Sequence, residues 1–326
     1  MLPGVRQGDP LSPFIFIIAK EALTGFMKKA TTMGCIKGIK LPNNGPNLTH
    51  LMYADDVIFM GEWDEGNIKN IIRLMRCFHI SGLKLSPKNS SLFGIGVDTN
   101  LLLNVANGIR CDVGKFPCKY LGLLVGANMN QVKHWKGVIN CVKSRLSKWK
   151  SKVLFVGGRS TLLKSVLDSL PLYYFSLYKA PKGVLDSLEA LRRCFFWEVM
   201  MKKKKMAWVC WERVLGPVEK GGLGFGSLRT MNISLLLKWW WRYKTESGSL
   251  WKRTVEAIHN NPSSWSYLLI KVGIAGVWNG IIKEERDLVE WDVQVSQLLF
   301  VAGIKDGSSV RFWLDKWNDV EKKKHR

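Results

Sequence analysis

The sequence predicts an α+β protein in which a mixed region of short strands and helices precedes a basic, mainly helical region. Before residue 128, short apolar runs alternate with turn clusters such as LPNNGPN at 41–47. After residue 128, apolar residues recur at helical spacing, and Lys and Arg occupy many of the positions between them. No Gly/Ser-rich linker marks a sharp boundary between the two regions.

The composition is that of a folded and strongly basic protein. Of 326 residues, 47% are hydrophobic, and 49 Lys and Arg against 26 Asp and Glu give a net charge of +23. This hydrophobic content supports a packed core and argues against a disordered tail. The positive charge favours polyanionic partners, of which nucleic acid is the commonest, although charge by itself also fits a basic protein without such a partner.

The cysteine pattern predicts free thiols in a reducing compartment. Seven cysteines are scattered along the chain without a Cys-x-x-Cys pair, and the five histidines do not complete a zinc spacing with them. The early apolar run FIFIIA at 14–19 is too short to span a membrane, and no secretory signal is visible. We therefore expect an intracellular protein without a membrane partner.

The elements of the first region follow from local signals. The glycine- and proline-rich loop GVRQGDPLSP leads into a helix for which Ser12 is the expected N-cap and Pro13 the first helical residue. Strands are expected at 48–53 and 57–61, on either side of an Ala54-Asp55-Asp56 turn, followed by a helix at 65–80. Further strands are expected at 92–97 and 116–126.

The second region reads as a series of amphipathic helices. The segment 134–150 places Trp135, Val138, Val142, Leu146 and Trp149 along one stripe, with Lys and Arg over much of the remaining surface. In LKWWWRYK, at 237–244, the tryptophans either stack on nucleic-acid bases or pack in a core. We expect at least two of the three to pack, because adjacent residues point in different directions around a helix.

Two adjacent carboxylates, Asp55 and Asp56, interrupt the otherwise apolar run THLMYADDVIFMG. One interpretation is an ordinary hairpin turn, where Asp is common because its side chain hydrogen-bonds nearby backbone. The other is a cation site, since carboxylate oxygens suit Mg²⁺, which proteins bind through one or two carboxylates together with substrate phosphates. The pair by itself leaves both interpretations open.

Other segments bear on this choice. Tyr53-Ala54-Asp55-Asp56 and the loop RQGDPLSP at 6–13 together resemble the reverse transcriptases of plant non-LTR (LINE-type) retrotransposons. SGLKLSPKNS, KYLGLLVG, LSKWK, GGRSTLLKSVLDSLP, FFWE, KGGLGFGSL, KWWWR and RFWLDKW are similar to that lineage in the same order, so the resemblance covers nearly the whole chain. It implies part of a reverse-transcriptase palm, with an Asp-Asp β-hairpin packed on helices, followed by a mainly α-helical thumb and connector.

The resemblance also implies an RNA-directed DNA polymerase, a nucleotidyltransferase that uses two Mg²⁺ ions, with Mn²⁺ as an alternative. Asp55 and Asp56 would be the catalytic metal ligands. Tyr53 would lie beneath the incoming nucleotide and the primer end. The residues implied to line the nucleotide and template pocket are Arg6, Gln7 and Gly8. The implied partners are an RNA template and a DNA primer, and the implied location is the nucleus.

Four segments follow from the same resemblance. Residues 1–97 would be the C-terminal part of the palm, and residues 98–130 the primer-grip strands. Residues 131–260 would form the helical thumb and connector, and residues 261–326 an irregular region leading toward a zinc-binding segment. The primer grip itself would be formed by Tyr120, Leu121 and Gly122.

Two departures from the family pattern lead us to expect that this chain alone polymerises nothing. Ser86 and Asn89 stand where the family usually has Asn and Lys, with Lys88 one position early. The strand with the first catalytic aspartate and the fingers, which precede the RQGDP loop in the family, are not in the sequence. We expect a missing N-terminal half to be required, and the alternative is a non-catalytic, basic nucleic-acid-binding remnant.

Overall fold

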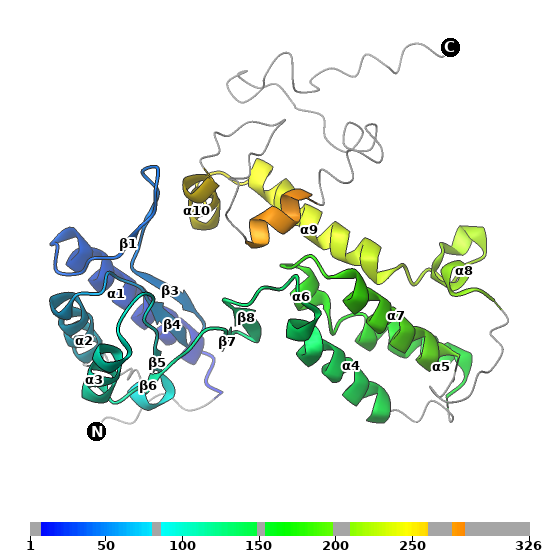
Figure 1. Cartoon of the computed structure of the whole chain (residues 1–326), viewed down its shortest axis with the longest axis horizontal. Coiled ribbons are helices and arrows are strands. Elements are labelled where there is room, and N and C mark those ends of the chain that lie inside the picture. Colours follow the sequence, from blue (N-terminus) through cyan, green and yellow to red (C-terminus); the bar gives the residue numbers. More distant parts are fainter. Residues whose placement is uncertain (1–7, 80–85, 149–153, 198–208, 260–275, 284–326) are drawn as a thin grey trace, which may run out of the picture. The chain divides into compact units, whose positions relative to one another are not determined.

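The computed structural model describes residues 8–79, 86–148, 154–197, 209–259 and 276–283 (Figure 1). The chain divides into two compact units, Met1–Phe116 and Pro117–Arg326. Both units combine helices with short strand pairs, which confirms the α+β class, with helices predominating. The palm architecture and the four predicted segments stay predictions.

Among its described residues, the first unit contains three helices and three short pairs of strands. The helices are α1 (Ser12–Thr32), α2 (Glu65–His79) and α3 (Thr99–Ile109), with a 3₁₀ turn, η1, at Pro87–Asn89. Antiparallel pairs join β1 (Ile39–Lys40) to β2 (Asn47–Leu48) and β3 (His50–Tyr53) to β4 (Asp56–Phe59). A parallel pair joins β5 (Ser91–Leu92) to β6 (Asp112–Val113).

Two helices of this unit differ from the sequence expectation. Helix α1 begins at Ser12, so Leu11 rather than Ser12 occupies the N-cap position. Helix α3 lies at the start of the segment predicted as primer-grip strands. Its N-cap is Asp98, whose side chain accepts hydrogen bonds from the backbone N–H groups of Asn100 and Leu101. This cap, followed by LLLNVANGI, is a helix signal that the sequence analysis missed.

One face of the β3–β4 hairpin covers the core of the first unit. Alternate residues of a strand point to opposite faces. Met52, Val57 and Phe59 pack on a core whose fully enclosed members are Leu23, Met27, Ile36 and Phe78. Tyr53 and Asp56 therefore belong to the opposite face, away from this core.

The second unit begins with the antiparallel hairpin of β7 (Cys118–Tyr120) and β8 (Leu123–Val125). Its helices are α4 (Lys136–Lys148), α5 (Val156–Leu162), α6 (Leu172–Phe175), α7 (Lys182–Phe196), α8 (Trp211–Leu215), α9 (Leu228–Thr245) and α10 (Leu250–His259). Shorter helical turns are η2 (Val132–Trp135), the π-helical η4 (Leu163–Leu167) and η5 (Val218–Lys220). Helices α4 and α5 both pack on α7 (Figure 1).

The predicted stripe of α4 faces the main core of this unit. Trp135, Val138 and Val142 are buried there with Phe175 and Val184, and Leu146 packs against them. Trp149 lies outside the described residues. Burying one stripe leaves Lys136, Lys143 and Arg145 of α4 exposed to solvent.

A second aromatic core joins α9 to α10 and to a helical segment at 277–283. Trp240, Tyr243 and Trp278 are buried in it, and Trp239 packs against it while donating its indole N–H to the Ser176 carbonyl. Trp241 is 45% exposed. Two of the three adjacent tryptophans therefore pack, as the sequence predicted.

A buried network of charges holds α7 to its neighbours. Arg192 is only 2% exposed, and its Nε lies 2.9 Å from Asp168 Oδ1 while its Nη1 lies 2.9 Å from Glu189 Oε1. The Glu189 carboxylate also accepts hydrogen bonds from Trp211 Nε1 at 3.0 Å and from the Leu228 backbone N–H at 2.8 Å. The network thus connects α7 with α8, with the start of α9 and with the residue that follows η4.

We expect Arg192→Met to destabilise the second unit by about 3–5 kcal/mol, because two carboxylates would lose their buried cation. Urea unfolding followed by tryptophan fluorescence measures the change. Arg193→Met is the matched control, since Arg193 is the exposed neighbour on the same helix and should change stability little. Equal losses from the two variants would contradict a special role for the buried arginine.

A second prediction concerns pH. His259 is 6% exposed, and burial lowers its pKa below the ordinary value. The unfolded chain therefore binds this proton more readily than the folded chain does. The resulting stability is fully present above about pH 6.5 and is lost as the pH falls through the lower folded-state pKa.

Urea unfolding at pH 7.5 and pH 5.5 should show a smaller loss of stability on acidification in His259→Gln than in the unmodified chain. The comparison isolates His259 from His50, whose pKa burial also lowers. An identical loss in both proteins would contradict this account of His259.

Candidate functional site

The Asp pair lies at the tip of the β3–β4 hairpin. Strand residues pair in the register His50 with Phe59 through Tyr53 with Asp56, which leaves Ala54 and Asp55 as a two-residue loop. Both carboxylates are exposed, so neither carries the cost of burial in an apolar environment. Tyr53, 64% exposed, is the cross-strand partner of Asp56, and paired residues share one face of a hairpin.

The loop backbone is constrained. Ala54 has φ of +46°, a left-handed conformation that side-chain-bearing residues seldom adopt. Two-residue hairpin loops favour positive φ at the first loop position, because that geometry matches the twist of the flanking strands. The tight loop therefore places Asp55 and Asp56 next to each other at a fixed point, with the core anchoring the hairpin from its other face.

The donor set suits a hard divalent cation in part. Two adjacent carboxylates provide oxygen ligands of the kind that Mg²⁺ prefers, and this ion commonly completes its shell with water and phosphate oxygens. Within the described ranges, no group of three or more His, Cys, Asp or Glu side chains is placed to hold a metal ion. The described residues thus supply a pair of metal ligands rather than a complete protein cage.

The other predicted nucleotide-site residues lie at the start of the chain. Arg6 and Gln7 lie outside the described residues. Gly8 is exposed with φ of +88°, and among the described residues no atom beyond its chain neighbours lies within 4 Å of the position that a Cβ would take there. The backbone at Gly8 is therefore open to the approach of a ligand. Lys88 and Asn89 lie on the exposed turn η1.

The predicted primer-grip residues form the tip of the β7–β8 hairpin. Tyr120 pairs with Leu123, so Leu121 and Gly122 make another two-residue loop, with φ of +48° and +82°. Positive φ at both positions is typical of a type I′ turn, which usually carries Asn, Asp or Gly at the first position. This hairpin belongs to the second unit, whereas the Asp pair belongs to the first.

A long basic stretch without acidic residues begins at the end of the first unit and continues into the second. Residues 113–167 contain eleven Lys and Arg and no Asp or Glu. Its exposed cations on η2 and α4 are Lys133, Lys136, Lys143 and Arg145. Because the opposite face of α4 is buried, these charges form an outward basic face, which we call the α4 basic face.

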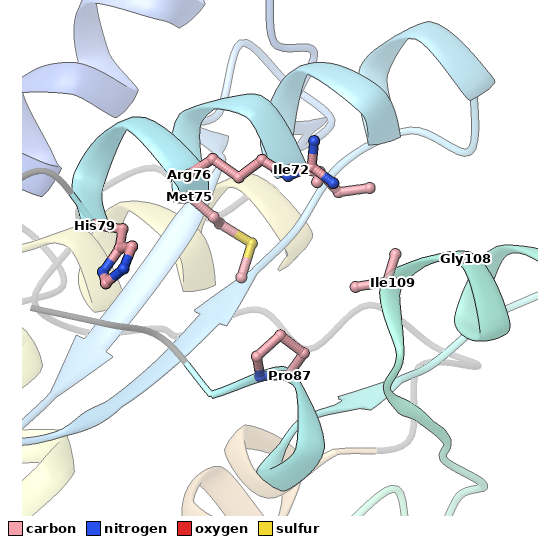
Figure 2. A pocket seen from close by; sticks show the side chains of 7 residues that line it. All are labelled: Ile72, Met75, Arg76, His79, Pro87, Gly108 and Ile109. Atoms are coloured by element: carbon pink, nitrogen blue, oxygen red, sulfur yellow. The ribbon is translucent and has the colours of Figure 1, made fainter.

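A groove in the first unit was not predicted from the sequence. It has a volume of about 220 Å³ and is lined by Ile72, Met75, Arg76, His79, Pro87, Gly108 and Ile109. Figure 2 shows Met75 of α2, Pro87 of η1 and Ile109 of α3 around one space. None of the predicted site residues lines this groove, so the groove and the Asp pair share no residue.

Two buried asparagines hold backbone segments in place, and the sequence analysis missed both. Asn67 accepts from the Lys37 N–H and donates to the carbonyls of Lys37 and Glu62, each at 2.9 Å. Asn232 accepts from the Ala180 N–H and donates to the carbonyls of Phe175 and Tyr178. Asparagine within a helical pattern usually signals solvent exposure, so local sequence carried no sign of these partners.

Comparison with known proteins places the chain among retrotransposon-related sequences, although no family model matches it. It is 34% identical over 184 residues to the “Putative ribonuclease H protein” of Arabidopsis thaliana, covering 55% of this chain and 28% of that protein. It is 25% identical over 248 residues to the “Transposon TX1 uncharacterized 149 kDa protein” of Xenopus laevis, covering 74% of this chain and 18% of the relative.

A third relative is the retrovirus-related Pol polyprotein from the type-1 retrotransposable element R2 of Nasonia vitripennis. The identity is 28% over 138 residues, which cover 37% of this chain and 12% of the polyprotein. These matches show that the chain is homologous to proteins of non-LTR retrotransposons. The chain spans between 12% and 28% of the length of these three relatives.

The length and apolar character of the helices bear on whether any of them could span a membrane. Within the parts of the chain that the structure describes, none of them combines the length and apolar character needed to cross a bilayer.

The strained loop yields a third prediction. Ala54→Gly should stabilise the first unit by about 1 kcal/mol, because glycine adopts positive φ without the steric cost that alanine carries. Ala22→Gly, at an exposed position within α1, should instead destabilise the unit by about 1 kcal/mol. Thermal unfolding measures both. Destabilisation by Ala54→Gly would contradict the left-handed loop.

Proposed function

We propose that the chain contributes the Asp-bearing palm hairpin and a nucleic-acid-binding helical unit to a LINE-type RNA-directed DNA polymerase. The observation that carries this proposal is the Asp55-Asp56 pair, exposed on a two-residue loop of a hairpin whose other face is fixed in a core. Homology to retrotransposon proteins supports it. An ordinary surface turn would also tolerate two aspartates, but the sequence context on both sides follows the polymerase pattern.

In this proposal Asp55 and Asp56 hold Mg²⁺ beside the primer end. When bound, the ion would lower the barrier to attack of the primer 3′-oxygen and neutralise charge on the departing pyrophosphate. Tyr53 shares a hairpin face with Asp56 and would offer its exposed ring to the nucleotide. Arg6, Gln7 and Gly8 are proposed to line the nucleotide and template pocket.

The helical unit would bind the RNA–DNA duplex. The α4 basic face presents Lys and Arg without intervening acidic residues, which is the arrangement that neutralises phosphates along a backbone. Tyr120, Leu121 and Gly122 are proposed to contact the primer. Nuclear location stays a prediction from the resemblance.

The basic stretch at 113–167 also favours a second function, that of a non-catalytic nucleic-acid-binding protein. Under this alternative the aspartates are dispensable and only binding remains. The two functions differ in one respect: only the polymerase requires the carboxylates of Asp55 and Asp56.

Primer extension on a primed RNA template with Mg²⁺ separates them, with Asp55→Asn/Asp56→Asn as the matched variant. Extension that vanishes in the variant supports the polymerase. Binding without extension, equal in both proteins, supports the second function. Absence of binding would contradict both functions.

A fourth prediction concerns salt. Replacing Lys136, Lys143 and Arg145 by Gln should weaken duplex binding and reduce the slope of log affinity against log salt concentration by about 3, roughly one for each lost phosphate contact. Fluorescence anisotropy between 50 and 200 mM salt, on the order of the range where such contacts are released, measures the slope.

The matched control removes the same charge from the first unit, at the exposed residues Lys28, Lys29 and Arg73. This triple Gln variant should leave the slope nearly unchanged. Equal effects of the two triple variants would mean that net charge, rather than the α4 basic face, determines binding.

A further inference from the structure

The geometry points to Tyr174 and Tyr178 as positioning residues that hold the β7–β8 hairpin in place for contact with the end of a nucleic-acid duplex. This inference rests on the proposed function, since it concerns how that function is carried out at Tyr120, Leu121 and Gly122. It adds residues from a different element, more than fifty positions further along the chain, to which the resemblance gives no role.

Two phenol groups reach the hairpin backbone from α6 and the turn after it. Tyr174 Oη donates to the Gly122 carbonyl at 2.8 Å, and Tyr178 Oη donates to the Leu124 carbonyl at 3.3 Å. The first distance is typical of a good hydrogen bond, and the second is longer and weaker. Both acceptors lie at the tip of the hairpin or on the strand that leaves it.

The hairpin needs such support. Its strands have three residues each and pair only with each other within the described residues, and an isolated two-stranded hairpin is marginally stable in water. Leu121, with φ of +48°, adds a left-handed conformation that costs about 1–2 kcal/mol for a side-chain-bearing residue. Contacts from outside the hairpin must therefore favour this conformation over a relaxed one.

The tyrosines are themselves firmly held. The ring centroid of Tyr174 lies 5.7 Å from that of Trp135. Trp135 is fully buried and donates its indole N–H to the Met129 carbonyl. The ring centroids of Tyr174 and Tyr178 lie 6.2 Å apart. Burial raises the pKa of both hydroxyls, so both stay protonated donors at neutral pH.

These contacts hold the backbone of the β7–β8 loop in place while the tip of the hairpin stays exposed. Gly122 is exposed, and among the described residues beyond its chain neighbours only a carbon of Tyr173, at 3.9 Å, lies within contact range of the position that a Cβ would take. Lys119, on the strand that enters the loop, is exposed as well. A phosphate or sugar can thus approach the loop backbone beside a cation, with the loop held from behind by two hydroxyls.

The test compares Tyr174→Phe with Tyr173→Phe in the full chain. Tyr174→Phe keeps the ring packing on Trp135 and removes only the hydrogen bond to Gly122. Tyr173 is the adjacent tyrosine, 48% exposed, and among the described residues the hydroxyls that donate to the hairpin carbonyls are those of Tyr174 and Tyr178. The probes are an RNA–DNA duplex with a recessed 3′ end and a blunt duplex of equal length, each measured by anisotropy.

We expect Tyr174→Phe to reduce the preference for the recessed end roughly three- to tenfold, as loss of one hydrogen bond implies, with blunt-duplex affinity unchanged. Amide hydrogen exchange at residues 121–124 should quicken in the same variant. Tyr178→Phe should act in the same direction but less, and Tyr173→Phe should change neither measurement.

Each other outcome overturns the inference at an identifiable point. If the unmodified chain shows no preference for the recessed end, the proposed function fails and the positioning role fails with it. If that preference exists and Tyr174→Phe retains it, only the positioning role is wrong. If both affinities and the melting temperature fall together, Tyr174 is structural rather than positioning.

Discussion

The alternation of side chains along the β3–β4 hairpin decides where the residues of the candidate site point. Met52, Val57 and Phe59 pack on the core of the first unit, and this contact fixes the register of both strands. A shift of one residue would turn the apolar set to solvent and bury Asp56, so the register is strongly specified. The exposed Asp pair is thus a direct consequence of which face the hydrophobic effect buries.

The second unit depends on a comparable constraint inside its helices. Arg192 is enclosed and paired with two carboxylates, one on its own helix and one just beyond η4. On α4, the buried stripe packs into the same core and leaves Lys136, Lys143 and Arg145 outside. The number of positive charges is set by the composition, but the packing of the core decides that these three lie on the surface.

Local patterns predicted much of this structure. The hairpin around Asp55, the stripe of α4 and the packing of two of three adjacent tryptophans follow from periodicity over a few residues. Strand 92–97 was overestimated, because the apolar run LFGIGV continues past the residues that pair, into a segment where Gly96 takes positive φ. Helix α3 was missed at the Asp98 cap.

Long-range polar contacts were beyond such patterns. Arg192 is buried and the adjacent Arg193 is exposed, and no feature of the neighbouring sequence predicts which of the two arginines is buried. The partners of Asn67, Asn232 and Tyr174 lie five to 57 residues away, so only the folded backbone brings them together. At the Asp pair, the sequence predicted the hairpin and its turn. Metal binding at this turn stays a prediction.

The most direct measurement of the central claim is Mn²⁺-induced line broadening of backbone amides in an isotope-labelled chain, with Asp55→Asn/Asp56→Asn as control. We predict that low Mn²⁺ concentrations broaden the amides around 53–57 selectively, that Mg²⁺ reverses the effect, and that the variant shows none. Broadening elsewhere, or unchanged broadening in the variant, would mean that the exposed aspartates are an ordinary turn and not a metal site.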